Sequence, residues 1–205
     1  MLILNLLSAG RSRETVPIFP LSTVLFPGAL LPLRIFETRY MDMARERLRT
    51  KGLFGICLIK DGAEVGAPAV PEPVGCLARI GECDMQELGI LKVNTEGVER
   101  FRLLSSEVTK AGLIVGEIER FEPERTGEDQ GFAECAEFLR KAIAGIGEAR
   151  FLAPYRFEDP SWVSFRLAEI LPLRNDVKQK LLELTDATLR VAFLHRFLRQ
   201  QKLIA

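Results

Sequence analysis

The sequence predicts an α+β protein, in which a β-rich region with one inserted helix is followed by a helical bundle. From Val16 to Phe121, apolar residues mostly form short runs of strand length, separated by Gly, Asp, Asn or Lys-Gly turn signals. From Phe132 onward, apolar residues recur at about the 3.6-residue period of a helix. A polar stretch with one proline and two glycines lies between these regions and is typical of a linker. We therefore expect a β domain over residues 1–122, a linker over 123–131 and a helical domain over 132–205.

The strand-length runs of the first region follow one another at short spacing. They are Leu53–Ile59, Val74–Cys83, Gly89–Thr95, Val98–Leu104 and Gly112–Phe121. Short strands at this spacing indicate an antiparallel barrel or sandwich. Ahead of them, Pro17 and Pro20 predict an extended edge segment, because proline cannot donate to a central ladder. Pro27-Gly28 then predicts a turn that reverses the chain.

One helix interrupts the strands. Its apolar residues recur at helical spacing, and Gly52 stands where the helix is expected to end. These residues are Phe36, Tyr40, Met41, Ala44 and Leu48. The same segment holds the densest basic cluster of the chain, with Arg45 and Arg49 among its members. A solvated helix face explains this cluster best, and an edge that contacts phosphates is the alternative.

Four helices are predicted in the second region. The first is the apolar stripe that starts at Phe132. Asp159 followed by Pro160 is typical of an N-cap with proline at the first helical position. Asp176 is expected to start the third helix and Asp186 to cap the fourth. Helices with connections this short form a compact bundle, which we expect to pack beside the β domain.

Charge and hydropathy limit the partners and the compartment. The chain has 28 basic and 28 acidic residues, and a formal net charge of zero disfavours nucleic acid as the main partner. The run Val24–Leu33 is interrupted by prolines and glycine and is too short to span a bilayer. Met1–Leu7 is apolar but follows no basic residue, so we expect a tail rather than a secretion signal. Four cysteines without a CxxC pair fit a reducing cytoplasm, and no membrane partner is expected.

The search for catalytic motifs gives no positive result. None of the 16 glycines is followed by lysine, which excludes a P-loop. His195 is the only histidine and cannot form half of a zinc pair with another one. Carboxylate pairs such as Glu96 and Glu99, or Glu117 and Glu119, are typical of the solvent face of strands. We therefore expect no catalytic residue, no metal and no cofactor, and predict that the protein is not an enzyme.

One stretch carries a family resemblance. The segment VPIFPLSTVLFPG at Val16–Gly28 resembles the start of the N-terminal substrate-binding domain of Lon proteases. Agreement continues to the C-terminus through Leu31–Glu37, Arg39-Tyr40, Phe54–Ile59, Gly97–Phe101, Leu167–Leu173 and Lys178–Glu183. The resemblance implies a PUA-like β-barrel followed by a helical bundle, and a role in engaging polypeptide substrates.

The resemblance does not extend to the other activities of Lon proteins. Full-length Lon proteins continue into an ATPase module and a serine–lysine protease domain. This sequence ends at Ala205 without a Walker motif or a nucleophile signature, so it resembles the stand-alone members that keep only the N-terminal module. ATP hydrolysis and proteolysis are not expected of it.

The function predicted from these observations is a non-catalytic polypeptide-binding module. Its expected partners are unfolded polypeptides, or a protease or chaperone. An edge strand, or a groove between barrel and bundle, would take up extended segments through backbone hydrogen bonds and apolar pockets. Phe26 beside the Pro27-Gly28 turn, and Glu37 with Arg39 at a helix start, are the candidate binding residues.

Two alternatives belong to other classes. PUA-like barrels occur in RNA-binding proteins, although zero net charge and few tyrosines and tryptophans argue against a stacking surface. Salt-dependent RNA retention that is abolished by removing Arg45 and Arg49 would favour this alternative. A hydrolase that uses dispersed carboxylates or a cysteine is the second alternative. It would require two acidic side chains, or Cys57 with a base, in a deep cleft.

Overall fold

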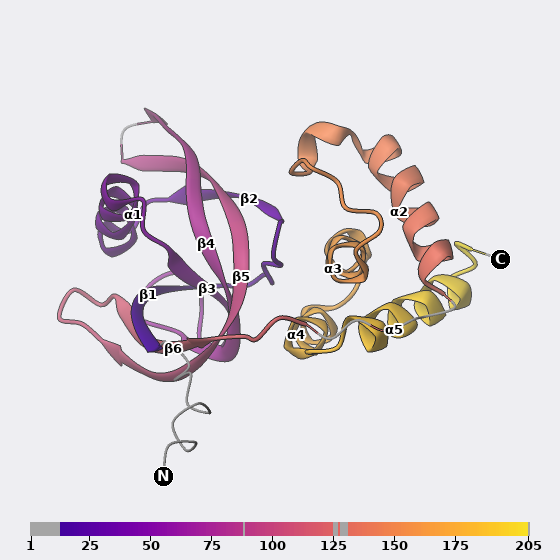
Figure 1. Cartoon of the computed structure of the whole chain (residues 1–205). Coiled ribbons are helices and arrows are strands. Elements are labelled where there is room, and N and C mark those ends of the chain that lie inside the picture. Colours follow the sequence, from indigo (N-terminus) through magenta and orange to yellow (C-terminus); the bar gives the residue numbers. More distant parts are fainter. Residues whose placement is uncertain (1–12, 88, 125–126, 128–130, 205) are drawn as a thin grey trace, which may run out of the picture.

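The computed structural model describes residues 13–87, 89–124, 127 and 131–204. The strands and the first helix form one body, and the remaining helices form a second body beside it (Figure 1). This arrangement confirms the predicted α+β class. The predicted N-terminal tail, Met1–Leu7, and part of the predicted linker lie outside the described residues. The domain boundaries at 122 and 132 stay a prediction.

Six strands form one sheet that closes on itself. They are β1 (Arg13–Leu21), β2 (Leu30–Ile35), β3 (Phe54–Asp61), β4 (Val70–Glu87), β5 (Ile90–Val108) and β6 (Ile114–Arg120). Their order is β2-β5-β4-β3-β1-β6, and β6 also pairs with the second half of β5. Five strands therefore form a barrel, and β2 is attached to its outside through β5. Two strands predicted at 89–95 and 98–104 are both part of the long strand β5.

The strand spacing predicted an antiparallel barrel, but the barrel contains one parallel pair of strands. β1 pairs antiparallel with β6 but parallel with β3. It changes partners at Ile18: residues 13–18 pair with β6, and residues 18–21 pair with β3. Pro17 and Pro20 therefore lie where β1 has a neighbour on one side only, although β1 as a whole is not an edge strand. Proline is tolerated at such positions because its missing N–H costs no ladder bond.

Two apolar clusters make up the core. The smaller one takes side chains only from the five barrel strands, with the fully buried Phe101 among them. The larger one continues from the helix α1 (Thr38–Thr50) across the sheet into the helical bundle. In α1, Tyr40 stacks on Phe19 of β1 with ring centroids 4.0 Å apart. The helix ends at Lys51 in the left-handed conformation (φ 53°), one residue before the predicted stop at Gly52.

The bundle consists of α2 (Phe132–Ile146), α3 (Pro160–Ile170), α4 (Asn175–Glu183) and α5 (Ala187–Gln200), with a short 3₁₀ turn, η1, at Glu148–Arg150. Both predicted caps are confirmed, because the Asp159 and Asp186 carboxylates accept hydrogen bonds from backbone N–H groups in the first turns of α3 and α5. Helix α4 begins at Asn175, one residue before the predicted start at Asp176, and Arg174 is its N-cap. Helix α3 packs against the three other helices.

Candidate functional site

The body of strands and the body of helices are joined along one interface, where side chains from each reach backbone groups of the other. The loop between β1 and β2 is held by α3. The guanidinium of Arg166 donates to the Pro27 carbonyl oxygen at 2.9 Å. Gly28 has a φ of +73°, and a Cβ there would lie 3.2 Å from Arg166 Nη1. The predicted turn therefore lies directly on the bundle.

Helix α4 adds two further contacts to the barrel. Gln179 donates from Nε2 to the Val74 carbonyl at 3.0 Å, and Asn175 donates from Nδ2 to the Ser22 carbonyl. In the reverse direction, Arg100 of β5 donates to the carbonyl oxygens of Leu182 and Leu184 at the end of α4. Those carbonyls have no partner within the helix, so a barrel arginine satisfies groups that a helix end normally leaves to solvent.

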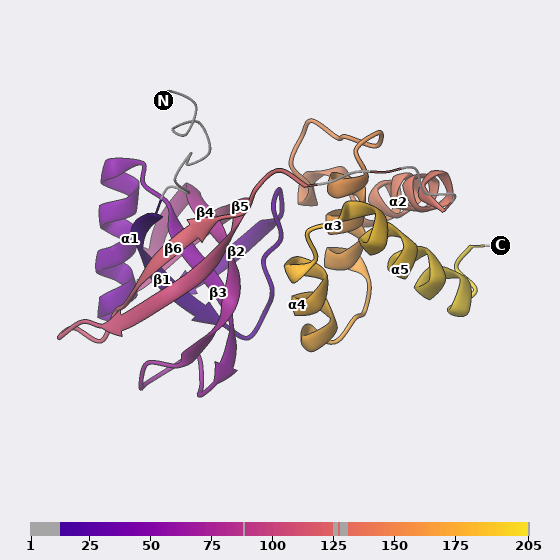
Figure 2. The same ribbon diagram turned by 60° about the horizontal axis from the view of Figure 1, so that its bottom comes forward.

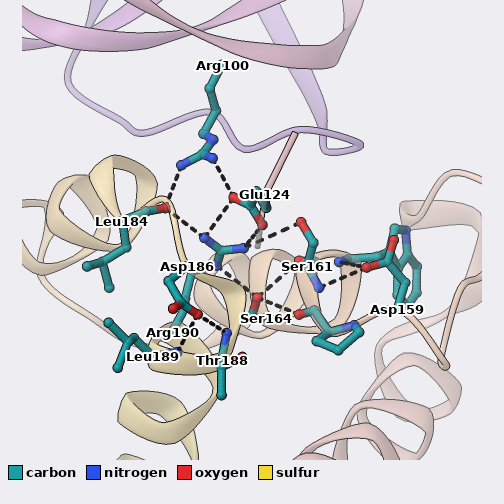
Figure 3. Close-up of polar contacts among 12 residues, drawn as sticks. Arg100, Glu124, Asp159, Ser161, Ser164, Leu184, Asp186, Thr188, Leu189 and Arg190 are labelled. Carbon is teal, nitrogen blue, oxygen red and sulfur yellow. Dashed lines mark hydrogen bonds and ion pairs between the residues drawn. The ribbon is translucent and has the colours of Figure 1, made fainter. Parts of the chain in front are cut away.

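A buried ion cluster lies at the centre of this interface. The Glu124 carboxylate, which follows β6, pairs with both Arg100 of the barrel and Arg190 of α5 (Figure 3). Arg190 binds it through two nitrogens, at 2.6 and 3.0 Å, and donates from Nε to Ser164 of α3. The Arg190 guanidinium also stands 3.8 Å from the ring centre of Phe165. One carboxylate thus links the barrel to two helices.

Charge neutralisation outweighs burial at Glu124. Burial alone opposes ionisation, but hydrogen bonds from Arg190 and Ser161 and the positive charges of Arg190 and Arg100 lower the pKa of Glu124 below its usual value. Burial lowers the pKa of Arg100, with Glu124 acting in the opposite direction. At neutral pH the Glu124 carboxylate and the guanidinium groups of Arg100 and Arg190 are therefore all ionised, and the carboxylate pairs with both arginines.

Two grooves flank the interface. The linker-side groove combines clefts of about 530 and 330 Å³ that share Pro27, Val98, Ser161 and Phe165. The β2-side groove is a cleft of about 490 Å³ between β2 and the helices. Its barrel wall contains Leu30, Pro32 and Asn94, and its helical wall combines the apolar Ile146, Ala149, Phe151 and Ile170 with the charged Arg150 and Glu169. Pro32 and Asn94 also line an adjoining cleft of about 900 Å³ on the barrel face.

The β2-side groove is the stronger candidate site. Its helical wall offers apolar side chains, and Ile146 is 41% exposed to solvent. Glu169 lies at the same wall; burial raises the pKa of this carboxyl against the opposing charges of Arg166, Lys178 and Arg150. The other wall is formed by β2, which Figures 1 and 2 show on the side of the barrel that faces the helices. Apolar side chains beside a strand edge can hold an extended chain.

The three predicted binding residues do not form one site. Phe26 is fully buried, with its ring centre 5.7 Å from that of Phe165, and it packs between barrel and bundle. Glu37 and Arg39 are together: their side chains form an ion pair at 2.8 Å. Arg39 also donates to the carbonyls of Gly66 and Gly112 and so ties α1 to two barrel loops. A role in binding stays a prediction for all three.

Sequence reasoning missed the buried arginines and the open edge. Arg100, Arg166 and Arg190 are at most 4% exposed, yet they were not singled out as interface residues. A signal was present for Arg166, which stands within the apolar stripe of Trp162, Phe165 and Ala168. The open edge was assigned to β1 on account of its prolines, whereas Pro32 marks the true edge strand.

The residues named for the alternative functions are poorly placed for that chemistry. Cys57 is buried in the barrel core, and burial raises the pKa of its thiol, so the reactive thiolate is disfavoured. On α1, Arg45 pairs with Asp42 and Arg49 with Glu46, so both exposed arginines already face a carboxylate. No group of three metal-binding side chains was found within the described residues.

His195 lies in α5 and pairs with Glu134 of α2. Its Nε2 is 2.9 Å from the Glu134 carboxylate, which joins α5 to α2. The hydrogen bond from His195 lowers the pKa of Glu134. Within the part of the chain that the structure describes, no helix has both the length and the apolar character needed to cross a membrane.

Comparisons with known proteins agree with this architecture. A family model, the ATP-dependent protease La (LON) substrate-binding domain, matches residues 15–200. The Lon protease of Desulfosudis oleivorans is 25% identical over 196 residues, which are 92% of this chain and 24% of that protein. The chain thus spans about a quarter of the length of this curated relative.

Solved structures show the same relationship. A Lon N-terminal domain protein from Xanthomonas campestris is 35% identical with a TM-score of 0.73, over 88% of this chain and 96% of that one. The N-terminal domain of a Mycobacterium avium complex Lon protease, at 20% identity and a TM-score of 0.65 over 88% and 96% of the two chains, shares the fold. With a family model that matches nearly its whole length, this chain belongs to the substrate-binding domain family of the ATP-dependent protease La (Lon).

Proposed function

We propose that this protein is a non-catalytic module that binds unfolded polypeptides or a partner protein and recruits them to proteolysis. The observation that carries the proposal is the β2-side groove, where a strand edge and an apolar helical wall face each other. Membership of a substrate-binding domain family supports the same conclusion. The protein itself makes and breaks no covalent bond in this proposal.

Physical reasoning favours a broad and weak specificity. A strand edge recognises the peptide backbone, which every polypeptide presents whatever its side chains are. A flexible segment loses conformational entropy when it is ordered in the groove, and this cost lowers the affinity. Folded proteins keep their backbone groups in their own sheets and helices, so they are poor ligands. The groove therefore distinguishes unfolded chains from folded ones.

Titration with a permanently unfolded polypeptide tests the proposal. The probe is reduced, iodoacetamide-blocked lactalbumin, with native lactalbumin as the folded control, and binding is followed by calorimetry and fluorescence anisotropy. We expect saturable binding of the unfolded form alone, with a dissociation constant in the micromolar range. No saturable signal at high micromolar concentration would contradict the proposal.

A matched pair of variants locates the binding. Ile146→Lys places a charge on the helical wall of the groove, whereas Leu203→Lys does so at an aliphatic residue of similar exposure outside it, 47% against 41%. We expect the first to weaken binding about tenfold, as loss of one buried aliphatic contact predicts, and the second to leave it unchanged. Recruitment requires in addition that the protein change the rate at which an ATP-dependent protease of the same cell degrades the bound probe.

A further inference from the structure

We propose that β2 is the docking strand: an extended polypeptide segment adds to its open edge inside the β2-side groove. This inference rests on the proposed function and specifies where and how the polypeptide is held. It commits to β-strand addition, in which main-chain hydrogen bonds provide the affinity and alternate side chains enter the groove.

Among the described strands, β2 is the one that has a single partner strand over its whole length, whereas β1 and β4 have a free side over only part of theirs. Each strand of the barrel has two neighbouring strands, because β6 closes the sheet by pairing with β5. β2 is different, since it pairs with β5 alone. A strand with one partner presents a row of backbone groups on its other side. The Leu30 and Pro32 side chains line the β2-side groove together with Asn94, which pairs with Pro32 on β5, so the groove covers one face of the sheet at this edge.

The pairing with β5 fixes which backbone groups point outward. The Ala29 carbonyl accepts from Gly97 N–H, and the Leu31 carbonyl accepts from the Thr95 hydroxyl, so odd-numbered residues face β5. Backbone groups alternate in direction along a strand, so those of Leu30 and Pro32 point away from β5. Outside the β2–β5 ladder, no hydrogen bond from the Leu30 N–H or to the Pro32 carbonyl is found within the described residues.

Proline at position 32 shapes what the edge accepts. Its carbonyl can accept a hydrogen bond, but it has no N–H to offer. The ligand residue opposite it must therefore supply a donor, which excludes proline at that position. Pairing of two copies of β2 about this point would set one proline against another and lose both bonds. The edge thus favours a foreign extended segment over a second copy of the same strand.

The groove also provides contacts for the side chains of a segment that pairs with β2. A segment that pairs with the six residues of β2 needs a stretch of about 20 Å at ~3.3 Å per residue. Alternate side chains of such a segment point to opposite faces of the sheet. Ile146 and Ile170 of the helical wall are placed to receive the apolar ones. Apolar side chains are therefore preferred at the positions that meet these two residues, beside which Arg150 and Glu169 line the same wall.

Backbone N-methylation of the ligand tests the inference directly. The probes are fluorescein-labelled peptides of about eight residues from the lactalbumin sequence, enough to span β2. The one that binds best is methylated at one amide at a time. Since only alternate amides face β2, we expect affinity to fall about tenfold at every second position and less than about twofold between them. Loss without alternation, or no loss at any position, would overturn β-strand addition.

Two measurements on the protein itself complete the test. Amide hydrogen exchange should slow at Leu30 when the peptide binds, whereas Leu31, already directed at β5, should not change. Leu30→Pro removes the outward N–H at the first residue of the strand, a position that tolerates proline, and Leu30→Ala controls for the side chain. We expect the proline variant to bind about tenfold more weakly than the alanine variant. Equal binding by the two folded variants, or unchanged exchange at Leu30, counts against the inference.

The outcomes separate this inference from the proposed function. Absence of binding by the unfolded polypeptide and by all peptides would contradict both. Binding that shows no alternation would leave the polypeptide-binding function intact and overturn the docking strand alone. Should Leu30→Pro fail to fold, the methylation series and the exchange measurement still decide, because both use the unaltered chain.

Discussion

The ring of Phe101 shows how single residues set the shape of the barrel core. A Cβ at Gly55 or Gly75 would lie 2.6 or 2.7 Å from its Cζ atom. At Gly75 the same Cβ would also approach the Ile56 carbonyl oxygen to 2.5 Å, and a backbone atom of a paired strand cannot move away easily. Two neighbouring strands therefore carry glycine because one aromatic ring occupies the volume between them.

Gly75→Ala is accordingly expected to destabilise the fold. We predict a loss of about 2–3 kcal/mol in the free energy of unfolding, in the range known for overpacked cores. Gly145→Ala is the control: it lies in α2 with open space around it, and alanine should add up to ~1 kcal/mol through helix propensity. Urea unfolding measures both. An unaltered midpoint for Gly75→Ala would contradict the role given to Phe101.

At the scale of elements, α3 holds the loop between β1 and β2 through Arg166. This guanidinium is 1% exposed, donates to the Pro27 carbonyl and pairs with Glu169 at 3.0 Å. The barrel supports the same loop from beneath, because a Cβ at Gly97 would lie 2.2 Å from the Phe26 carbonyl oxygen. The loop is thus fixed from two sides, and its position determines where β2 begins.

Arg166→Met tests the contribution of that clamp. The substitution keeps an apolar stem but removes the hydrogen bond to Pro27 and the arginine partner of Glu169, whose side chain is 25% exposed, and we expect about 2–3 kcal/mol of destabilisation. The double variant Arg166→Met/Glu169→Gln should regain part of that loss, because no uncompensated charge remains. Arg174→Met, which breaks an exposed pair with Asp176, serves as the control and should cost under ~1 kcal/mol. Urea unfolding measures the free energy of unfolding of each variant. A loss for Arg166→Met as small as the loss for Arg174→Met would contradict the role given to the clamp.

At the scale of the whole molecule, the cluster of Arg100, Glu124 and Arg190 connects the two bodies and makes their association sensitive to acid. The folded state lowers the pKa of Glu124, so between the folded and unfolded pKa values the unfolded chain binds more protons. Stability from this group is complete above the unfolded pKa and is lost as pH falls through the folded one. Protonation leaves the two arginines as buried charges without their counterion.

Glu124→Gln should therefore flatten the acid side of the stability profile. We expect the variant to be less stable than the parent at neutral pH, by about 3 kcal/mol for a broken buried pair, and the gap to close below pH ~4. Glu46→Gln removes a surface carboxylate, 45% exposed and paired with Arg49, whose pKa is also lowered, and should change the profile little. The free energy of unfolding of the parent and of the two variants is measured by urea unfolding across the acid pH range. A constant gap at all pH values would contradict the assignment.

The sequence predicted elements well and connections between them poorly, for physical reasons. Hydrophobic period and capping are local properties, so α2, α3 and α5 and the Asp159 and Asp186 caps could be predicted. The parallel pairing of β1 with β3 and the merging of two predicted strands into β5 depend on contacts between distant residues. The buried Arg100 and Arg190 belong to the same class, because a partner such as Glu124 is found only when the chain has folded.

The length of β5 has a mechanical consequence. Its first half, residues 91–96, carries β2, and Arg100, which holds the bundle, follows only about 13 Å further along the same strand. A client pulled lengthwise along β2 would load its ladder bonds in shear, all together, and the tension would pass through one continuous backbone to the helices.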